Sequence, residues 1–364
     1  MMRVLQISAD RSARGILHPG SPAFARQEAY AKEFGDLDVI AFSRLSDGAR
    51  DIEHGPLRIY PTNSRSPLFY GLDAIRIANT LTRPDVITAQ DPFETGLVAW
   101  WIARRLKVPL HIQVHTDFLS PEYARHSLLN RLRVSIAGFV LRRAKRIRVV
   151  SERIKKTIGE ECRLNVEISI LPIFTDIVRI RHMQSDPALV RAFERFDKKI
   201  LFVGRLEPEK NPSLAVRAFA EAAPEDTCLI IVGGGSERKT LGKLANKLGL
   251  MDGPRMVFFE EEAESAKYYP LADLVLVTSR YEGYGLVTIE ALAPGVPVLS
   301  TDVGIAKETG TIVASPEKFA DALREWFANG PRTTELKGYP YKNFDEYVHA
   351  YCADIAACAE DKKT

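Results

Sequence analysis

Long hydrophobic runs are absent from this chain of 364 residues. No stretch reaches the roughly 18 consecutive apolar residues that a membrane-spanning helix needs, and the apolar run near the start is too short for a secretory signal peptide. These absences predict a cytoplasmic protein. The 4 cysteines are scattered without the spacing of a zinc site, so we expect reduced, buried thiols.

A strong charge of one sign is missing as well, because 50 Lys and Arg residues are balanced by 47 Asp and Glu residues. The net charge of +3 leaves no excess of the kind that nucleic-acid-binding proteins carry, so no nucleic-acid partner is expected. The G-x-G-x-x-G fingerprint of dinucleotide-binding oxidoreductases follows none of the expected strands. The nearest pattern, Gly233-Gly234-Gly235, is interpreted as a strand-to-helix turn.

Short β-branched runs alternate with amphipathic stretches over most of the chain. The expected strands are Arg3–Ser8, Asp38–Phe42, Val86–Ala89, Leu110–Val114, Ile147–Val150, Ile200–Val203, Cys228–Val232, Met256–Phe259, Leu274–Thr278 and Pro297–Ser300. Helical patterns lie between most of them, for example at Ala25–Phe34, Leu214–Ala222 and Arg238–Leu248. Such alternation builds parallel sheets with helices on both faces, which predicts the α/β fold class with two doubly wound domains.

The sheet pattern lapses between residues 172 and 183 and restarts at Lys199. This lapse predicts a boundary between two domains over residues 1–178 and 179–343. A final amphipathic segment within residues 344–364 has no strand after it, and return to the first domain is one alternative for it. Ligands of open parallel sheets bind beyond the carboxyl ends of the strands, so a cleft between the two facing sheets is the expected active site.

Two cations, Arg205 and Lys210, follow the first expected strand of the second half. Gly204 allows a tight turn before them. Fixed cations at a strand end stabilise a leaving diphosphate, whose negative charge grows as a glycosidic bond breaks. The alternative is a solvated loop in which Glu207 and Glu209 neutralise the same two cations.

A second loop, Glu282-Gly283-Tyr284-Gly285-Leu286, leads from a later strand into a helix. Backbone N–H groups at a helix start bind anions. Glu282 can accept hydrogen bonds from sugar hydroxyls, and Glu290, in the second turn, from two vicinal hydroxyls such as those of a ribose. The alternative, acidic residues that complement the helix dipole, explains Glu290 poorly because it lies further along the helix.

This pattern, with Glu282 and Glu290 eight positions apart, resembles the E-x7-E signature of the retaining family 4, or group 1, glycosyltransferases. The loop from Gly204 to Lys210 is similar to the diphosphate-binding loop of that family, and the segment around His115 to its catalytic-histidine segment. The resemblance covers nearly the whole chain, with the motifs in the family's order. It implies the GT-B fold, in which two Rossmann-like domains face each other across a cleft, the first on the acceptor side and the second binding the nucleotide-sugar donor.

The resemblance also implies a role for each matched residue. Arg205 and Lys210 would bind the donor phosphates, Glu282 the transferred sugar and Glu290 the ribose, while His115 would lie by the donor sugar. The implied catalytic residues are therefore His115, Glu282, Arg205 and Lys210. The implied donor-binding residues are Gly20, Gly204, Arg205, Lys210, Glu282, Gly283, Tyr284, Gly285, Leu286 and Glu290. His111, inside the strand that precedes His115, is expected to be structural instead.

Three departures from the family pattern leave the donor base and sugar open. The loop after the first strand has single glycines, so Gly20 with Ser21 is the phosphate-approaching candidate there. The base-pocket strand is followed by Glu260-Glu261-Glu262 in place of a glycine, and Gly304 stands alone where the family commonly has two.

The implied function is retaining transfer of a hexosyl group from a UDP- or GDP-linked sugar to a glycan or lipid-linked acceptor, in cell-envelope polysaccharide or glycolipid synthesis. No cofactor is expected, because the two cations and a helix start can neutralise the leaving group without a metal. Asp36-Leu37-Asp38 spells the metal signature of a different glycosyltransferase fold, but it lies where a turn enters a strand. A nucleotide-sugar epimerase and a non-catalytic nucleotide-sugar-binding protein are the alternatives.

Positive charge is concentrated in residues 122–157, where eleven basic residues meet only Glu122 and Glu152. The basic residues are Arg125, Arg131, Arg133, Arg142, Arg143, Lys145, Arg146, Arg148, Arg153, Lys155 and Lys156. An apolar stripe at i, i+4 spacing, made of Leu128, Leu132, Ile136 and Val140, runs through the same segment. This combination predicts peripheral binding to an anionic membrane surface on the inner face. The alternative is that the stripe is core and the cations are solvated or receive an anionic substrate.

Overall fold

A computed structural model describes residues 2–10, 15–251, 253, 255–260 and 265–360. The chain divides into two compact units, and each is described by itself. The first unit comprises Met1–Pro172 and Tyr341–Thr364, and the second Ile173–Pro340. The divisions thus fall after Pro172 and Pro340, whereas the sequence placed them after residues 178 and 343.

The first unit contains an eight-stranded sheet with the order β3-β4-β2-β1-β5-β6-β7-β8. Its strands are β1 (Met2–Ser8), β2 (Gly35–Ala41), β3 (Ile52–His54), β4 (Leu57–Pro61), β5 (Val86–Ala89), β6 (Leu110–Val114), β7 (Arg146–Val149) and β8 (Glu167–Ile170). Neighbouring strands pair in parallel except at one edge, where β3 and β4 are antiparallel. Strands β3, β4 and β8 were not predicted from the sequence, because β3 and β8 have no fully buried residue and β4 alternates buried and half-buried positions.

Several helices of the first unit begin at a serine cap. They are α1 (Pro22–Phe34), α2 (Tyr70–Ala78), α3 (Glu94–Leu106), α4 (Pro121–His126), α5 (Leu128–Leu141), α6 (Glu152–Cys162) and α13 (Phe344–Glu360), with short 3-10 helices η1 (Leu45–Asp47) and η2 (Pro67–Phe69). Before α1, α5 and α6, a serine hydroxyl accepts a hydrogen bond from the backbone N–H three residues later. Each such cap contributes about 1 kcal/mol to helix stability.

The second unit contains a six-stranded parallel sheet with the order β11-β10-β9-β12-β13-β14. Its strands are β9 (Lys198–Val203), β10 (Thr227–Val232), β11 (Met256–Phe259), β12 (Leu274–Val277), β13 (Val298–Ser300) and β14 (Ile312–Val313). Its helices are α7 (Ile177–Arg181), α8 (Pro187–Phe193), α9 (Pro212–Ala222), α10 (Arg238–Lys247), η3 (Ser265–Leu271), α11 (Leu286–Leu292), η4 (Ala306–Glu308), η5 (Pro316–Lys318) and α12 (Phe319–Asn329). The sequence predicted five of these strands and missed only the two-residue β14.

Alternate residues of the central strands face two separate apolar cores. In β9, Ile200 and Phe202 pack with residues of α9, α10 and α12, while Leu201 packs with residues of α11 on the other face. Burial on both faces is why these strands read as continuous apolar runs. The doubly wound arrangement that the alternation predicted is confirmed for this unit.

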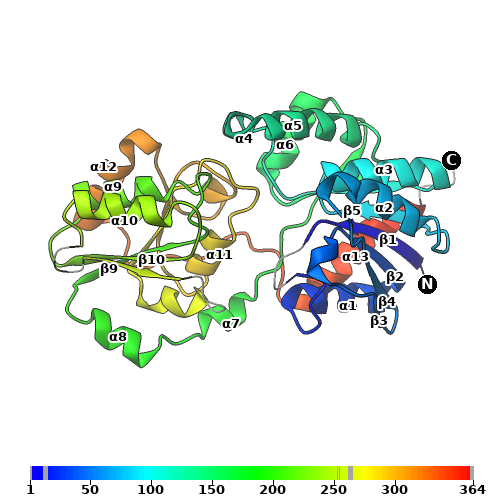
Figure 1. Cartoon of the computed structure of the whole chain (residues 1–364). Coiled ribbons are helices and arrows are strands. Elements are labelled where there is room, and N and C mark those ends of the chain that lie inside the picture. Colours follow the sequence, from blue (N-terminus) through cyan, green and yellow to red (C-terminus); the bar gives the residue numbers. More distant parts are fainter. Residues whose placement is uncertain (1, 11–14, 252, 254, 261–264, 361–364) are drawn as a thin grey trace. The chain divides into compact units, whose positions relative to one another are not determined.

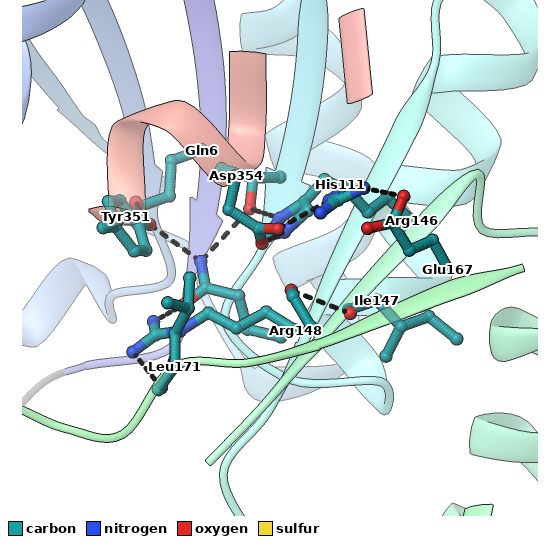
Figure 2. A network of polar contacts seen from close by, with 12 residues as sticks. Gln6, His111, Arg146, Ile147, Arg148, Glu167, Leu171, Tyr351 and Asp354 are labelled. Carbon is teal, nitrogen blue, oxygen red and sulfur yellow. Dashed lines mark hydrogen bonds and ion pairs between the residues drawn. The ribbon is translucent and has the colours of Figure 1, made fainter. Parts of the chain in front are cut away.

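Helix α13 returns to the first unit, where it packs beside α1 and contacts β5 and β6 (Figure 1). Its Asp354 accepts hydrogen bonds from His111 Nε2 at 3.0 Å and from Arg146 Nε at 2.5 Å (Figure 2). His111 Nδ1 lies 2.8 Å from the Thr88 hydroxyl. Both ring nitrogens of His111 are therefore bonded inside the fold, which confirms its expected structural role.

Burial shapes the charge state of this cluster. It lowers the pKa of His111 despite the neighbouring carboxylate. For Asp354, burial alone would raise the pKa, but the hydrogen bonds from His111 and Arg146 bring it down to about 2. Asp354 is thus an anion at neutral pH, and it holds α13 to β6 and β7.

Replacing Asp354 by Ala should destabilise the first unit by about 3 kcal/mol at pH 7, because a buried cation loses its partner. The depressed pKa means that this contribution exists above the unfolded pKa of about 3.9 and is lost as the pH falls toward 2. Urea unfolding at pH 7 and pH 3 should therefore show a smaller difference between variant and parent at the lower pH. The exposed Asp345, also on α13, provides the control Asp345→Ala. An equal loss at both pH values would contradict the assigned ion pairs.

Candidate functional site

The sheet of the second unit has a topological switch point at β9. From β9 the chain adds β10 and β11 on one side and β12, β13 and β14 on the other. The loops after β9 and β12 leave neighbouring carboxyl ends and lead to α9 and α11, which cover opposite faces. Open α/β sheets bind ligands at such a point. Both loops carry residues that the sequence predicted for a site.

The loop after β9 is only partly self-neutralised. Arg205, whose side chain is 65% exposed, pairs with Glu209 of the same loop at 2.7 Å. Lys210 instead pairs with Glu282 of the loop after β12. Glu207 accepts hydrogen bonds from the backbone N–H and hydroxyl of Ser236, at 2.9 and 2.6 Å. The alternative of a self-contained charged loop therefore holds for Arg205 but not for Lys210.

The triglycine turn after β10 supports this loop from behind. Gly233 and Gly235 have φ values of +142° and +151°, and a Cβ at either would lie 2.0 or 2.5 Å from the carbonyl oxygen of Gly204 or Leu206. The Leu206 N–H donates to the Gly234 carbonyl at 2.7 Å. The turn joins β10 to α10, as predicted. Its contact with the loop after β9 was not predicted from the sequence.

The loops after β9 and β12 are joined by several hydrogen bonds. The Thr278 hydroxyl donates to the carbonyl oxygens of Lys210 and Asn211, each 3.0 Å away. The backbone N–H of Arg280 donates to the backbone carbonyl of Glu209 at 2.8 Å. Glu282 Oε1 accepts from Ser279 Oγ at 2.7 Å as well as from Lys210. The expected residues Gly204, Arg205, Lys210 and Glu282 are thus brought together. Gly283, Tyr284, Gly285 and Leu286 form the turn that begins α11, with Gly285 at φ +99°.

Gly304 supports the β12 loop by close backbone approach. Its φ is +49°, and a Cβ there would lie 2.2 Å from the Tyr284 carbonyl oxygen. The Ile305 N–H donates to that same oxygen at 3.0 Å, and the Thr301 hydroxyl donates to the Ser279 carbonyl at 2.6 Å. The family commonly has two glycines here and this chain has one, Gly304, which lies where only glycine fits.

Glu290 lines a cavity of about 270 Å³ within the second unit. The lining also includes Leu286 at the start of α11, Ser265 and Arg179. The buried Tyr269 donates from its hydroxyl to Glu290 Oε2 at 2.7 Å. Burial raises the pKa of Glu290, and the Tyr269 hydrogen bond opposes that rise. No motif in the sequence pointed to Tyr269 as a partner of Glu290. Glu261 and Glu262 lie outside the described residues.

In the first unit, further candidate residues lie in the connections that follow β1, β5 and β6. His115 follows β6, and its Nε2 lies 3.2 Å from Gln113 Oε1. Burial, with Arg148 as the next cause, lowers the pKa of His115 to about 3. Gly20, with φ +85°, precedes the cap of α1. Asp91 follows β5, and burial raises its pKa; its place directly after a strand is the signal that could have predicted it.

The Asp36-Leu37-Asp38 sequence serves the sheet. Asp36 pairs with Arg3 at 2.5 Å and with Arg58, and Asp38 pairs with Arg58 at 2.6 Å. The two carboxylates are therefore neutralised by arginines of the same sheet. In the part of the chain that the structure describes, no cluster of three or more His, Cys, Asp or Glu side chains could hold a metal ion.

The basic residues of the segment 122–157 are only partly exposed. Arg148 is buried, Arg146 pairs with Asp354 and Glu167, and Arg133 pairs with Glu94 at 2.9 Å. The exposed cations are Arg125, Arg131, Arg142, Arg143, Lys155 and Lys156.

The apolar stripe of α5 is exposed only in its first half. Leu128 is 79% and Leu132 57% exposed, whereas Ile136 is half-buried and Val140 is core. Leu129, at 50%, adds to the exposed half. Among the described residues, no helix has the length and apolarity needed to cross a bilayer.

Two family profiles match consecutive parts of the chain. Residues 27–171 match the family described as Glycosyl transferase 4-like domain, and residues 191–343 match Glycosyl transferases group 1. The second match spans both loops of the switch point. The chain belongs to the group 1 glycosyltransferases.

Curated relatives of this glycosyltransferase match different shares of its length. The alpha-monoglucosyldiacylglycerol synthase of Streptococcus pneumoniae is 24% identical over 74% of this chain and 66% of its own length. The D-inositol 3-phosphate glycosyltransferase of Nocardia farcinica is 33% identical over 63% of this chain and 56% of its own length. The chain thus spans about one third to two thirds of the length of these and other curated relatives that it matches.

A solved structure, that of Anabaena HepE in complex with UDP, is similar to the whole glycosyltransferase chain. The TM-score is 0.69 at 18% identity, and the match covers 99% of this chain and 98% of HepE. At this identity the likeness shows the fold alone. It confirms the GT-B fold that the sequence motifs implied.

Replacing Gly304 by Ala should displace the β12 loop. The matched control is Gly310→Ala, because Gly310 also has a positive φ, +82°, but nothing lies within 4 Å of its added Cβ. Backbone strain alone costs about 1 kcal/mol, and the overlap with Tyr284 should add about 1–3 kcal/mol. Chemical denaturation of both variants measures the difference in the free energy of unfolding. Equal losses of this free energy would show that the close approach to Tyr284 does not affect stability.

Proposed function

We propose that this glycosyltransferase moves a hexosyl group from a UDP- or GDP-linked sugar to an acceptor, with retained anomeric configuration and without a metal. The observation that carries the proposal is that the Lys210–Glu282 ion pair joins the loops after β9 and β12. It brings a cation for the diphosphate and a carboxylate for the sugar to one point. The related fold of HepE has been solved with UDP and with UDP-glucose, which supports a nucleotide-sugar donor.

Lys210 and Arg205 stabilise the charge that develops on the leaving diphosphate. An ammonium group has three donors, so Lys210 can keep its bond to Glu282 while it binds a phosphate oxygen. Arg205 is exposed enough to turn from Glu209 to a phosphate. Because α11 has only 7 residues, we assign the neutralisation chiefly to these two side chains rather than to a helix dipole.

Glu282 binds the transferred sugar. Its Oε1 already accepts from Lys210 and Ser279, so Oε2 is the oxygen that accepts from a sugar hydroxyl. For a retaining reaction, the acceptor hydroxyl attacks C1 from the side that the diphosphate leaves. The C1–O bond to the diphosphate breaks, the new C1–O bond forms, and the acceptor proton passes to the departing phosphate. No protein nucleophile is then required.

Glu290 binds the ribose of the donor. The adjoining cavity of about 270 Å³ is close to the lower end of the roughly 300–1,000 Å³ that small-molecule sites occupy. A vicinal diol can donate to both carboxylate oxygens, and such donors would offset the burial that raises the pKa of Glu290. Gly20 and His115 of the first unit are assigned to the donor phosphates and the donor sugar.

The acceptor is proposed to be a glycan or a lipid-linked molecule at the inner membrane face, as in envelope polysaccharide or glycolipid synthesis. The Streptococcus pneumoniae relative is named for a diacylglycerol glycolipid. The exposed leucines of α5, with Arg131, Arg142 and Arg143, give this chain a surface of matching character. A nucleotide-sugar epimerase would instead convert the donor with no acceptor present, and a non-catalytic binding protein would leave the donor intact.

Arg205→Ala and Lys210→Ala should each lower the turnover of donor by about 100-fold, because a transition-state charge loses its partner. Slow donor hydrolysis, screened over UDP- and GDP-sugars in the presence of EDTA, provides the assay before an acceptor is known. Arg217→Ala, an exposed cation on α9, is the control and should leave turnover unchanged. Near-normal turnover in both site variants would remove the diphosphate assignment, and a requirement for Mn²⁺ or Mg²⁺ would overturn the metal-free mechanism.

Binding to anionic liposomes should rise with the fraction of anionic lipid and fall with added salt, since each cation near the surface contributes up to about 1 kcal/mol. Exchanging Leu128 and Leu132 for Ser, or Arg131, Arg142 and Arg143 for Gln, should weaken co-sedimentation and spare donor hydrolysis. Arg50→Gln with Arg65→Gln, exposed cations elsewhere in the first unit, serves as control. If the parent protein ignores anionic liposomes at low salt, a soluble acceptor replaces the lipid-linked one.

A further inference from the structure

Gln113, on β6 of the first unit, uses all of its hydrogen-bonding capacity inside the fold. Its amide nitrogen donates to the Tyr351 hydroxyl at 2.9 Å and to the Thr88 hydroxyl at 3.1 Å. Its amide oxygen, Oε1, lies 3.0 Å from Arg148 Nη1 and 3.2 Å from His115 Nε2. An amide has two donors and can accept two hydrogen bonds, so nothing in Gln113 is left over.

Arg148 fixes which way the Gln113 amide points. A guanidinium can only donate, so the atom that faces it must be the amide oxygen. Arg148 is itself immobile, because it is 1% exposed and its other N–H groups donate to the Leu171 carbonyl at 2.9 and 3.1 Å (Figure 2). The ring of Tyr351, from α13, stacks 5.0 Å from the guanidinium carbon. The orientation of Gln113 therefore depends on strands β6 and β7 and on the returning helix together.

A fixed acceptor at Gln113 decides where the proton of His115 lies. Because Oε1 can only accept, His115 Nε2 must carry a hydrogen and donate it. The imidazole is neutral at physiological pH, since burial and then the charge of Arg148 lower its pKa to about 3. Nδ1 therefore bears a lone pair. No described residue donates to it, although it is buried. Buried polar atoms without a partner are rare in native proteins and usually mark a functional contact or a bound molecule.

We propose that Gln113 and Arg148 are positioning residues that hold His115 as the Nε2–H tautomer, so that Nδ1 serves as a hydrogen-bond acceptor for a hydroxyl of the bound sugar. The tautomer depends only on the geometry of the first unit. The assignment of the sugar hydroxyl rests on the proposed function. His111 differs from His115 because both of its ring nitrogens are bonded within the protein.

Nitrogen-15 NMR of histidine-labelled protein tests the tautomer without any substrate. The chain has 7 histidines, and the His115 signals are assigned by comparison with His115→Asn. We expect a protonated Nε2 and an unprotonated Nδ1, unchanged between about pH 5 and 8, where an ordinary histidine titrates. A protonated Nδ1, a mixture of tautomers or a normal titration would overturn the proposal whatever the enzyme's activity.

Variants separate positioning from general stability. Gln113→Met removes the acceptor and should give mixed tautomers with about 10-fold lower kcat, while affinity for the bare nucleotide stays the same. Gln27→Met makes the same change at another buried amide, which bonds to Gln6 and not to His115, and should leave both readings unchanged. Gln113→Glu keeps an acceptor, so it should retain the Nε2–H form and guards against misfolding of the Met variant.

The contact between His115 Nδ1 and a sugar hydroxyl is tested by titration with a UDP- or GDP-sugar that the hydrolysis screen has identified as a donor. The Nδ1 resonance should shift on binding of the sugar nucleotide and not on binding of the nucleotide alone. If the tautomer is as expected but Nδ1 responds to neither ligand, the sugar contact is wrong. If Gln113→Met retains the pure Nε2–H form, Gln113 is not the residue that positions the imidazole. If no nucleotide sugar is bound at all, the proposed function fails while the tautomer result stands.

Discussion

Close backbone approach is the constraint on which the switch-point site depends. Gly233, Gly235 and Gly304 each occupy a positive φ with a carbonyl oxygen where a Cβ would lie. These contacts press the loops after β9 and β12 onto the turns behind them. Only then can Lys210 of one loop reach Glu282 of the other. The side chains proposed to bind the donor are thus positioned by glycines, which shows how a rigid backbone can fix a polar site at the edge of a sheet.

In the first unit, polar residues are positioned by other buried polar side chains rather than by glycines. Thr88, Gln113, Arg148, Tyr351 and Asp354 form one hydrogen-bonded layer between the sheet and α13. Such a network is stabilising only when every member is satisfied, because an unpaired buried group costs about 1–3 kcal/mol. His115 Nδ1 is the exception in this layer. The exception falls on the residue that the sequence matched to the histidine of the family.

The distribution of charge shows why local sequence is a poor guide to a surface. Eleven cations lie close together in residues 122–157, yet the fold turns Arg146 and Arg148 inward to bind α13 and the end of the first unit. The same folding leaves Leu128, Leu129 and Leu132 outside. The resulting surface has fewer exposed cations and more exposed apolar side chains than the sequence alone implied.

Sequence by itself determined the parallel sheets of both units, since central strands buried on both faces must be apolar throughout and helices must alternate with them. It also predicted which loops form the candidate site, because Arg205, Lys210 and Glu282 come shortly after strands and Glu290 lies in the helix that follows. Edge strands such as β3 and β8 escaped prediction, because their half-exposed residues lack a hydrophobic signature. Tertiary structure alone decided the partners: Lys210 with Glu282, Tyr269 with Glu290, and Asp354 with His111, 243 positions away. Such pairs depend on chain segments meeting in space, and local patterns of residues contain no information about which segments will meet.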